Sequence, residues 1–293
     1  MELIDGKLLS KQIKEEIARD VAEMKENGDK VPHLAAVLIG ANPASQFYVR
    51  SKTKSCDQVG FKSSLIERGA DVTEEEVLQI VHDLNNDPDV DGFIVQLPLP
   101  KHIDELKITL AIDPKKDVDG FHPVNVGRMS LGLPSYLPAT PYGIIQMLER
   151  YKIETSGLHC VVVGRSNIVG TPMSILMSRK AKIGNATVTI THSRTRNLKK
   201  VVQQADIVIA AIGIANFVTA DMIKPGAIVI DVGINRVEDA TKKRGYRVVG
   251  DVDFENVAPI SSFITPVPGG VGLMTVTSLL MNTLQAAKRE IYG

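Results

Sequence analysis

The sequence contains no tryptophan, and only 4% of its residues are aromatic, so few side chains are available to stack on nucleic-acid bases. Lysine plus arginine equals aspartate plus glutamate at 34 each, and the zero net charge gives no field that favours nucleic acid or an anionic membrane. No apolar run approaches the length needed to span a bilayer. The composition therefore predicts neither a nucleic-acid nor a membrane partner.

Cysteine is also scarce. Cys56 and Cys160 lie far apart without a CxxC companion, which excludes a disulfide framework and a cysteine zinc site and predicts two buried thiols. The six histidines show no metal-ligand spacing. The N-terminal segment has no continuous apolar stretch typical of a secretory signal. We expect a cytoplasmic enzyme without a metal.

What the sequence does have is a regular alternation of strand and helix patterns. Strands are predicted at 33–40, 61–67 and 91–97, the first of them buried, and helices at 8–28, 43–59, 73–87 and 103–112. In the second half, strands are predicted at 158–164, 186–191, 206–213, 227–233 and 246–252, before a final helix at 275–290. This alternation predicts an α/β protein with parallel sheets covered on both faces. The 293 residues suffice for two domains of roughly 100–200 residues each.

The segment 113–141 breaks this alternation, because it is rich in glycine, proline and aspartate. Loops of this length are usually functional. We interpret it as an inter-domain segment that also helps to build a cleft.

A candidate phosphate-binding loop, "VVVGRSNIVGTP", begins the second half. Gly164 ends a buried strand and Gly170 starts a helix, so the backbone and the helix N-terminus could approach a phosphate. The two glycines are six residues apart and do not form G-x-G-x-x-G, so a structural turn without a ligand remains an alternative.

The next strand, 186–191, favours NADP over NAD. It is followed by His192, Ser193 and Arg194 rather than by an acidic residue, which would bind an NAD ribose and repel a 2′-phosphate. Arg165 and Arg194 could neutralise that phosphate, although each could also be an ordinary surface charge.

Tyr48 and Lys52, in "FYVRSKTKSC", have the i, i+4 spacing of neighbours on one helix face. They form the Y-x-x-x-K pattern of short-chain dehydrogenases, but there the pattern follows the nucleotide loop, whereas here it precedes Gly164 by more than a hundred residues. The simpler interpretation is that Tyr48 packs in the core and Lys52 is solvated. The other interpretation is that the two residues form a catalytic pair.

Six segments in order decide between these readings: "NPASQFYVRSKTK", "GFIVQLPLP", "PKKDVDGFHP", "GRSNIVGTPM", "KPGAIVIDVGINR" and "TPVPGGVG". Together they resemble the bifunctional methylenetetrahydrofolate dehydrogenase/methenyltetrahydrofolate cyclohydrolase family, called FolD in bacteria. The resemblance extends from residue 2 to about residue 290. It implies an N-terminal αβα catalytic domain at 1–139, completed by a C-terminal helix at 271–293, and a Rossmann-type NADP-binding domain at 140–270.

The same resemblance implies roles for single residues. Lys52 is the central acid/base group, Tyr48 stacks on the aminobenzoyl ring, Gln96 hydrogen-bonds with Lys52, and Asp119 grips the pterin. The implied folate site, in a cleft between the domains, also includes Leu97, Pro98, Pro268, Gly269 and Gly272. The implied NADP site consists of Thr140, Gly164, Arg165, Ser166, Ile168, Val169, Gly170, Ser193, Arg194, Ala211, Ile212, Gly213, Gly233 and Ile234. The resemblance further implies tetrahydrofolate substrates and a homodimer.

Several positions depart from the family's usual residues: Ala139, Tyr142, Ile214, Ala215 and Leu273. A cation that is common at two of these positions is missing, and we expect its loss to weaken the binding of the cofactor phosphate unless another group compensates. Three alternatives stay open: a dehydrogenase with little or no cyclohydrolase activity that could use NAD, another two-lobed enzyme such as an amino-acid dehydrogenase, and a folate- or nucleotide-binding regulatory protein. Finally, Asp251 and Asp253 in "GDVDF" could be a metal pair, although hydrogen bonding at a strand end is the better interpretation.

Overall fold

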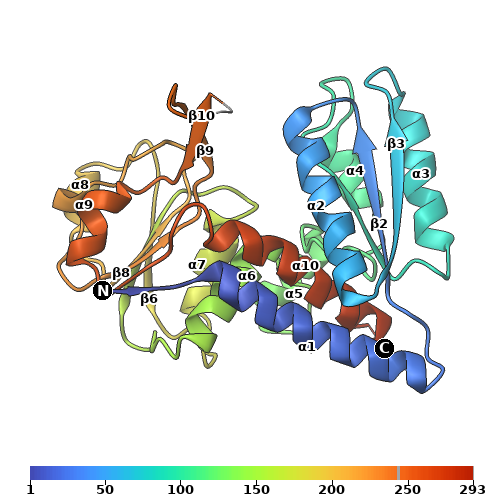
Figure 1. The fold of residues 1–293 in the computed structure, drawn as a ribbon, viewed down its shortest axis with the longest axis horizontal. Helices are drawn as coiled ribbons and strands as arrows, with labels where there is room; N and C mark the ends of the chain where they lie inside the picture. Colours follow the sequence, from blue (N-terminus) through green and yellow to red (C-terminus); the bar gives the residue numbers. More distant parts are fainter. Residues whose placement is uncertain (243–244, 293) are drawn as a thin grey trace. The chain divides into compact units, whose positions relative to one another are not determined.

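The computed structural model describes residues 1–242 and 245–292, and it has the predicted α/β architecture with parallel sheets. The chain forms two compact units (Figure 1). The first, here the six-strand unit, contains Met1–Ser10 and Thr140–Thr275. The second, here the three-strand unit, contains Lys11–Ala139 and the chain from Val276 onward. In the described chain, no helix is both long and apolar enough to span a membrane.

The three-strand unit is built on a parallel sheet in the order β3-β2-β4. Every residue of β2 is buried, because helices cover both faces of the sheet. Helix α3 and helix α4 pack with alternate strand residues in one apolar cluster, and α2 lies on the other side of the strands (Figure 1). The elements of this unit are β2 (His33–Ile39), α2 (Pro43–Val59), β3 (Lys62–Arg68), α3 (Glu74–Asn86), β4 (Gly92–Val95), α4 (Glu105–Ala111) and α5 (Pro123–Ser130).

Local sequence accounts for several of these boundaries. Thr73, where the predicted helix at 73–87 begins, caps α3 in a complete capping box with Glu76. Helix α2 has the predicted bounds. Helix α5 was not predicted, and it interrupts the loop expected at 113–141. His122 caps it by accepting a hydrogen bond from the backbone N–H of Val124.

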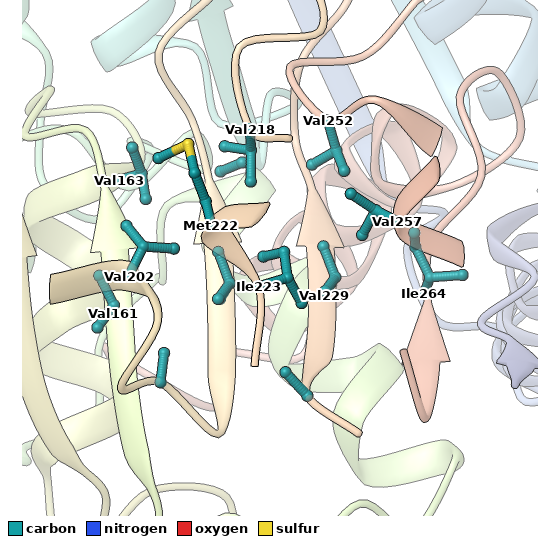
Figure 2. Close-up of a cluster of buried hydrophobic side chains, with 14 of the residues drawn as sticks. Val161, Val163, Val202, Val218, Met222, Ile223, Val229, Val252, Val257 and Ile264 are labelled. Carbon is teal, nitrogen blue, oxygen red and sulfur yellow. The ribbon is translucent and has the colours of Figure 1, made fainter. Parts of the chain in front are cut away.

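The six-strand unit has a parallel sheet in the order β1-β11-β8-β7-β5-β6. Its elements are β1 (Glu2–Leu3), α6 (Ala139–Arg150), β5 (His159–Val163), α7 (Gly170–Ser178), β6 (Thr187–Thr191), α8 (Leu198–Val202), β7 (Ile207–Ala210), the 3₁₀ helix η1 (Ala220–Met222), β8 (Ile228–Asp231), β9 (Asn235–Glu238), β10 (Tyr246–Val249), α9 (Phe254–Val257), η2 (Ala258–Ile260) and β11 (Phe263–Ile264). Figure 2 shows the apolar cluster on one face of this sheet, where strand residues such as Val161 and Val229 pack against Val202, Met222 and Val257.

Two expectations about this unit need correction. The predicted strand at 246–252 does not join the parallel sheet; among the residues that the structure describes, β10 pairs only with β9, in a separate antiparallel hairpin. The edge of the sheet is instead completed by β11 and β1. Because β1 pairs with β11, residues 1–10 group with the six-strand unit rather than with the predicted first lobe.

Two long helices contribute to both units along the chain. Helix α1 (Gly6–Glu26) starts in the six-strand unit and ends in the three-strand unit, and so does α10 (Val271–Ala287). The expected return of the C-terminal helix to the first lobe is therefore seen from Val276 onward. Both cysteines are buried free thiols, as predicted, and burial raises the pKa of each to about 12.

Candidate active site

Lys52 lies on the buried face of α2, between Val49 and Cys56. Residues three and four apart share a helix face, so a lysine at this position projects with its apolar neighbours. Only 9% of Lys52 is exposed. It is therefore not the solvated helix lysine that the simpler reading of the sequence suggested.

A single hydrogen bond orients the Lys52 amine. Its Nζ donates to Oε1 of Gln96 at 3.1 Å, and Nε2 of Gln96 donates to the Leu97 carbonyl at 2.8 Å. The second bond turns the amide so that its oxygen faces the lysine. An ammonium has three donors, and within the described chain Gln96 is the only acceptor that Lys52 has.

Burial lowers the pKa of Lys52 below the ordinary lysine value, and the nearby negative charge of Asp119 opposes this shift in part. The dominance of burial means that a larger fraction of the amine is neutral at a given pH than for an exposed lysine. A partly neutral amine can accept a proton, which a normal lysine at neutral pH cannot do efficiently.

The residue before Asp119 is held in place by packing and by a hydrogen bond. Val118 is fully buried, and its carbonyl accepts a hydrogen bond from Nδ2 of Asn282 at 2.8 Å. The same amide nitrogen donates to the Leu137 carbonyl at 2.8 Å. Gly120 has a positive φ of 75°, and a side chain there would clash with the backbone of Leu137. Asn282, on the C-terminal helix, therefore holds the segment that carries Asp119.

Asp117 ties this segment to the start of helix α5. Its buried carboxylate accepts from the His122 backbone N–H at 2.8 Å and from Nδ2 of Asn125 at 2.9 Å. Burial raises the pKa of Asp117 to about 7, against the opposing effect of these hydrogen bonds. Oδ1 of Asn125 in turn accepts from the Tyr292 hydroxyl at 2.7 Å. Sequence analysis missed Asn282 and Tyr292, because no local pattern marks a contact across more than a hundred residues.

The other predicted folate residues divide between the two units. Tyr48 is half-buried one turn before Lys52, and its ring meets that of the exposed Phe47 edge-on at 6.2 Å. Leu97 and Pro98 directly follow Gln96. Pro268, Gly269 and Gly272 belong instead to the six-strand unit.

The predicted phosphate loop has the geometry of a tight strand-to-helix turn. Gly164 has a φ of 128°, and a side chain there would clash with the Ala211 carbonyl. Gly170 packs so closely on Gly164 that it has no room for a side chain either. Oγ of Ser166 accepts from the N–H groups of Val169 at 3.2 Å and Gly170 at 3.4 Å, which stand at the start of α7.

A pocket of about 520 Å³ lies at this turn, within the six-strand unit. Among the predicted cofactor residues, those that line it are Gly164, Arg165, Ser166, Ser193, Ala211 and Ile212. The lining also includes residues that were not predicted: Val163, His192, Thr195, Leu198, Ile214 and Phe217. No acidic residue occurs among the described residues of this lining.

The remaining predicted cofactor residues lie outside this lining, as far as the structure describes it: Thr140, Ile168, Val169, Gly170, Arg194, Gly213, Gly233 and Ile234. Thr140 hydrogen-bonds with Thr275 at 2.9 Å. The backbone N–H of Arg194 donates to Nδ1 of His192 at 3.1 Å, and its side chain is exposed. Their roles stay predictions.

The two aspartates of the "GDVDF" segment accept hydrogen bonds at the end of the strand. Asp251 is fully buried and accepts three N–H groups, whereas Asp253 accepts from Nδ2 of Asn256. The described residues contain no group of three or more histidine, cysteine or acidic side chains arranged to hold a metal ion.

Comparison with known protein families matches both units. Residues 4–119 match the family model described as tetrahydrofolate dehydrogenase/cyclohydrolase, catalytic domain. Residues 138–291 match the model of the NAD(P)-binding domain of the same family.

Individual relatives agree over the full length. The chain is 63% identical over 287 residues to the bifunctional protein FolD of Cytophaga hutchinsonii, covering 98% of this chain and 99% of that protein. Its fold is similar to the crystal structure of the bifunctional enzyme FolD from Campylobacter jejuni, with a TM-score of 0.93, 46% identity and 99% coverage of both chains. It is also similar to the Trypanosoma brucei dehydrogenase-cyclohydrolase complexed with NADP and an inhibitor, with a TM-score of 0.93, 38% identity and coverage of 99% and 98%.

Proposed function

The chain belongs to the tetrahydrofolate dehydrogenase/cyclohydrolase family, and from this premise we propose that it is a bifunctional, NADP-dependent enzyme of folate one-carbon metabolism. It oxidises methylenetetrahydrofolate to methenyltetrahydrofolate and hydrolyses the latter to 10-formyltetrahydrofolate. The single observation that carries the proposal is the buried Lys52, oriented by Gln96 within the part of the chain that matches the catalytic domain.

The pocket at Gly164 suits NADP. Its glycine turn brings the chain of Gly164, Arg165 and Ser166 to the lining, and Arg165 adds a positive charge there. The absence of an acidic side chain from its described lining removes the group that would repel a 2′-phosphate. The chemistry that NADP supplies when bound is acceptance of a hydride.

Lys52 serves the hydrolytic step as a base. The oxygen of a water molecule adds to the methenyl carbon, and the neutral amine takes the proton that the water loses. The carbon–nitrogen bond to N5 then breaks as the hydroxyl of the adduct loses its proton and N5 takes one up, which leaves the formyl group on N10. The lowered pKa of Lys52 makes the neutral amine available, and Gln96 holds it without adding a charge.

The same lowered pKa helps the oxidation. Loss of a hydride from the methylene bridge leaves a positive charge on the carbon, which a fixed ammonium nearby would oppose. A neutral Lys52 avoids this repulsion. We assign Tyr48 to the aminobenzoyl ring by stacking, and Asp119 to the N–H donors of the pterin as a charged acceptor.

A spectrophotometric assay with methylenetetrahydrofolate tests the proposal, run in parallel with NADP and NAD against a control without enzyme. We expect NADP reduction with little accumulation of the absorbing methenyl compound, and accelerated hydrolysis when that compound is added alone. Accumulation of the methenyl compound would indicate a dehydrogenase alone. No reduction with either cofactor would contradict the proposal.

We propose further that the enzyme is a cytoplasmic homodimer without a nucleic-acid partner. The resemblance to the family supports the dimer, and the zero net charge gives no attraction to nucleic acid. Light scattering coupled to gel filtration measures the mass directly; a value near the 31.8 kDa of one chain would contradict the dimer.

A further inference from the structure

The side chain of Asp251 is a buried carboxylate that accepts its hydrogen bonds from one loop and one side chain. Its Oδ2 accepts from the backbone N–H of Ile212 at 2.7 Å and of Gly213 at 2.9 Å. Its Oδ1 accepts from Nδ2 of Asn235 at 2.9 Å. The side chain has no exposed surface, so these N–H groups replace the water that an ionised carboxylate needs.

The loop that Asp251 holds is a wall of the cofactor pocket. It follows β7, and Ala211, Ile212 and Ile214 line the pocket beside Gly164. Two consecutive N–H groups that converge on one point form an anion-binding concavity. Here the protein's own carboxylate fills that concavity, so these two amides do not bind cofactor phosphate, and their role is to fix the wall.

Asp231 fixes Asp251 in turn. Its buried carboxylate accepts from the backbone N–H of Asp251 at 2.9 Å, of Val252 at 3.0 Å and of Gly233 at 2.9 Å. A side chain at Gly250 would clash with this carboxylate, so the residue before Asp251 must be glycine. The two carboxylates thus join the end of β8, the segment 250–252 and the loop after β7.

We propose that Asp251 is a positioning residue for the cofactor, because its carboxylate holds the loop after β7 in the conformation that completes the pocket at Gly164. The proposal rests on the proposed use of NADP. A metal role for Asp251 and Asp253 does not fit, because N–H donors take up both oxygens of Asp251.

The variant Asp251→Asn tests this role, because it puts an NH₂ group where one of the two N–H-facing oxygens stood. We expect the Kd of NADP, measured by titration calorimetry, and the KM for NADP to rise about tenfold, as for the loss of a charged hydrogen bond. Hydrolysis of added methenyltetrahydrofolate should keep its rate, because that step needs no hydride acceptor.

Asp253→Asn is the matched control, since Asp253 lies two residues away in the same motif and does not line the cofactor pocket. It should leave both activities and the Kd of NADP unchanged. An unchanged Kd in Asp251→Asn would overturn the proposal. So would a parallel loss of both activities, because that indicates a general structural role. Failure of the unaltered protein to bind NADP would instead overturn the proposed cofactor, and this inference with it.

If Asp251→Asn does not fold, Asn235→Ala provides a milder test. It removes the donor to Oδ1 of Asp251 and leaves both loop bonds possible. The carboxylate is then less constrained, and we expect the Kd of NADP to rise about two- to threefold. An unaltered Kd in this variant would overturn the proposal.

Discussion

Lys52 and Asp251 are both buried ionisable side chains, one in each unit, and they differ in how fully the protein satisfies their hydrogen-bonding groups. Asp251 accepts three N–H groups, which satisfies both of its oxygens. Lys52 has three possible donors and, within the described chain, one acceptor. The six-strand unit therefore uses a buried carboxylate to fix geometry, because a group whose hydrogen bonds are all made is held rigidly.

The three-strand unit uses burial to change a protonation state. Burial removes the Lys52 amine from water and so favours its neutral form, which lowers the pKa of Lys52. A shifted pKa is typical of a group that takes part in a reaction, as we propose for Lys52. A carboxylate with all its hydrogen bonds made, such as Asp251, is suited to holding a loop in place. Variants that alter one unit should therefore affect different steps from variants that alter the other.

The largest effect should come from Lys52→Met, which removes the base and keeps a long apolar side chain. We expect the hydrolysis of methenyltetrahydrofolate to fall by about 10³-fold, toward the spontaneous rate, because general base catalysis typically supplies 10²–10⁴. Binding of the folate, measured by fluorescence quenching, should persist. Lys54→Met, on the exposed side of the same helix, is the control and should retain activity. Enzymatic hydrolysis by Lys52→Met clearly above the spontaneous rate would refute the role of Lys52.

Gly164→Ala should give the next largest effect, and in the other unit. The new methyl group clashes with the Ala211 carbonyl at a backbone φ of 128°, so the turn must move and distort the pocket. We expect kcat/KM for NADP to fall by about 100-fold, equivalent to about 2.7 kcal/mol, while hydrolysis of methenyltetrahydrofolate continues.

Gly157→Ala separates the clash from the backbone strain. Gly157 also has a positive φ, of 76°, but a side chain there meets no atom within 4 Å. It should lower the free energy of unfolding by about 1 kcal/mol and leave NADP binding unchanged. An equal loss of NADP binding in the two variants would show that local crowding at Gly164 is not what matters.

Asn282→Leu should give a smaller effect, confined to the folate substrate. It removes the two hydrogen bonds that hold the Val118 and Leu137 carbonyls and so frees the segment that carries Asp119. We expect KM for methylenetetrahydrofolate to rise about tenfold, with the Kd of NADP unaltered. Thr283→Val removes a buried hydroxyl whose bond stays within α10, and it should leave this KM unchanged. A rise in KM in the control variant but not in Asn282→Leu would reverse the assignment.

The features that sequence analysis predicted are those whose cause is local. Most of helix α1 follows from apolar residues at three- and four-residue spacing, and the start of α3 follows from Thr73. The turn at Gly164 follows from a glycine between a buried strand and a helix. Lys52 shares the spacing of its buried neighbours, although only the family resemblance favoured a catalytic reading over a solvated one.

The features that were missed depend on distant partners. Strands β1 and β11 have two residues each, too few for a periodic pattern, and they pair across almost the whole chain. β10 looks like any sheet strand in sequence, and only its pairing with β9 removes it from the parallel sheet. Asn282 is an ordinary polar residue in an apolar helix until its contact with Val118 is known.

The smallest expected effect is on stability, and its sign follows from the pKa of Lys52. The pKa of the folded state is lowered, so the folded protein releases this proton at a pH where the unfolded chain still holds it. The cost of burying the amine is therefore fully present below the folded-state pKa, and it shrinks as pH rises toward 10.5, the ordinary value. Lys52→Met removes this cost, while water can reach the half-buried Gln96 and replace the lost donor. We expect the variant to be more stable by about 1 kcal/mol in urea unfolding at neutral pH, with a gain that decreases toward pH 10.

The exposed Lys54→Met should change stability by less than about 0.5 kcal/mol at either pH. A gain that instead grew with pH would mean that the folded protein favours the charged form of Lys52. In that case the amine would be protonated when the methenyl compound binds, and Lys52 would resemble Asp251 as a satisfied structural charge. The contrast between the two units would then lose its basis.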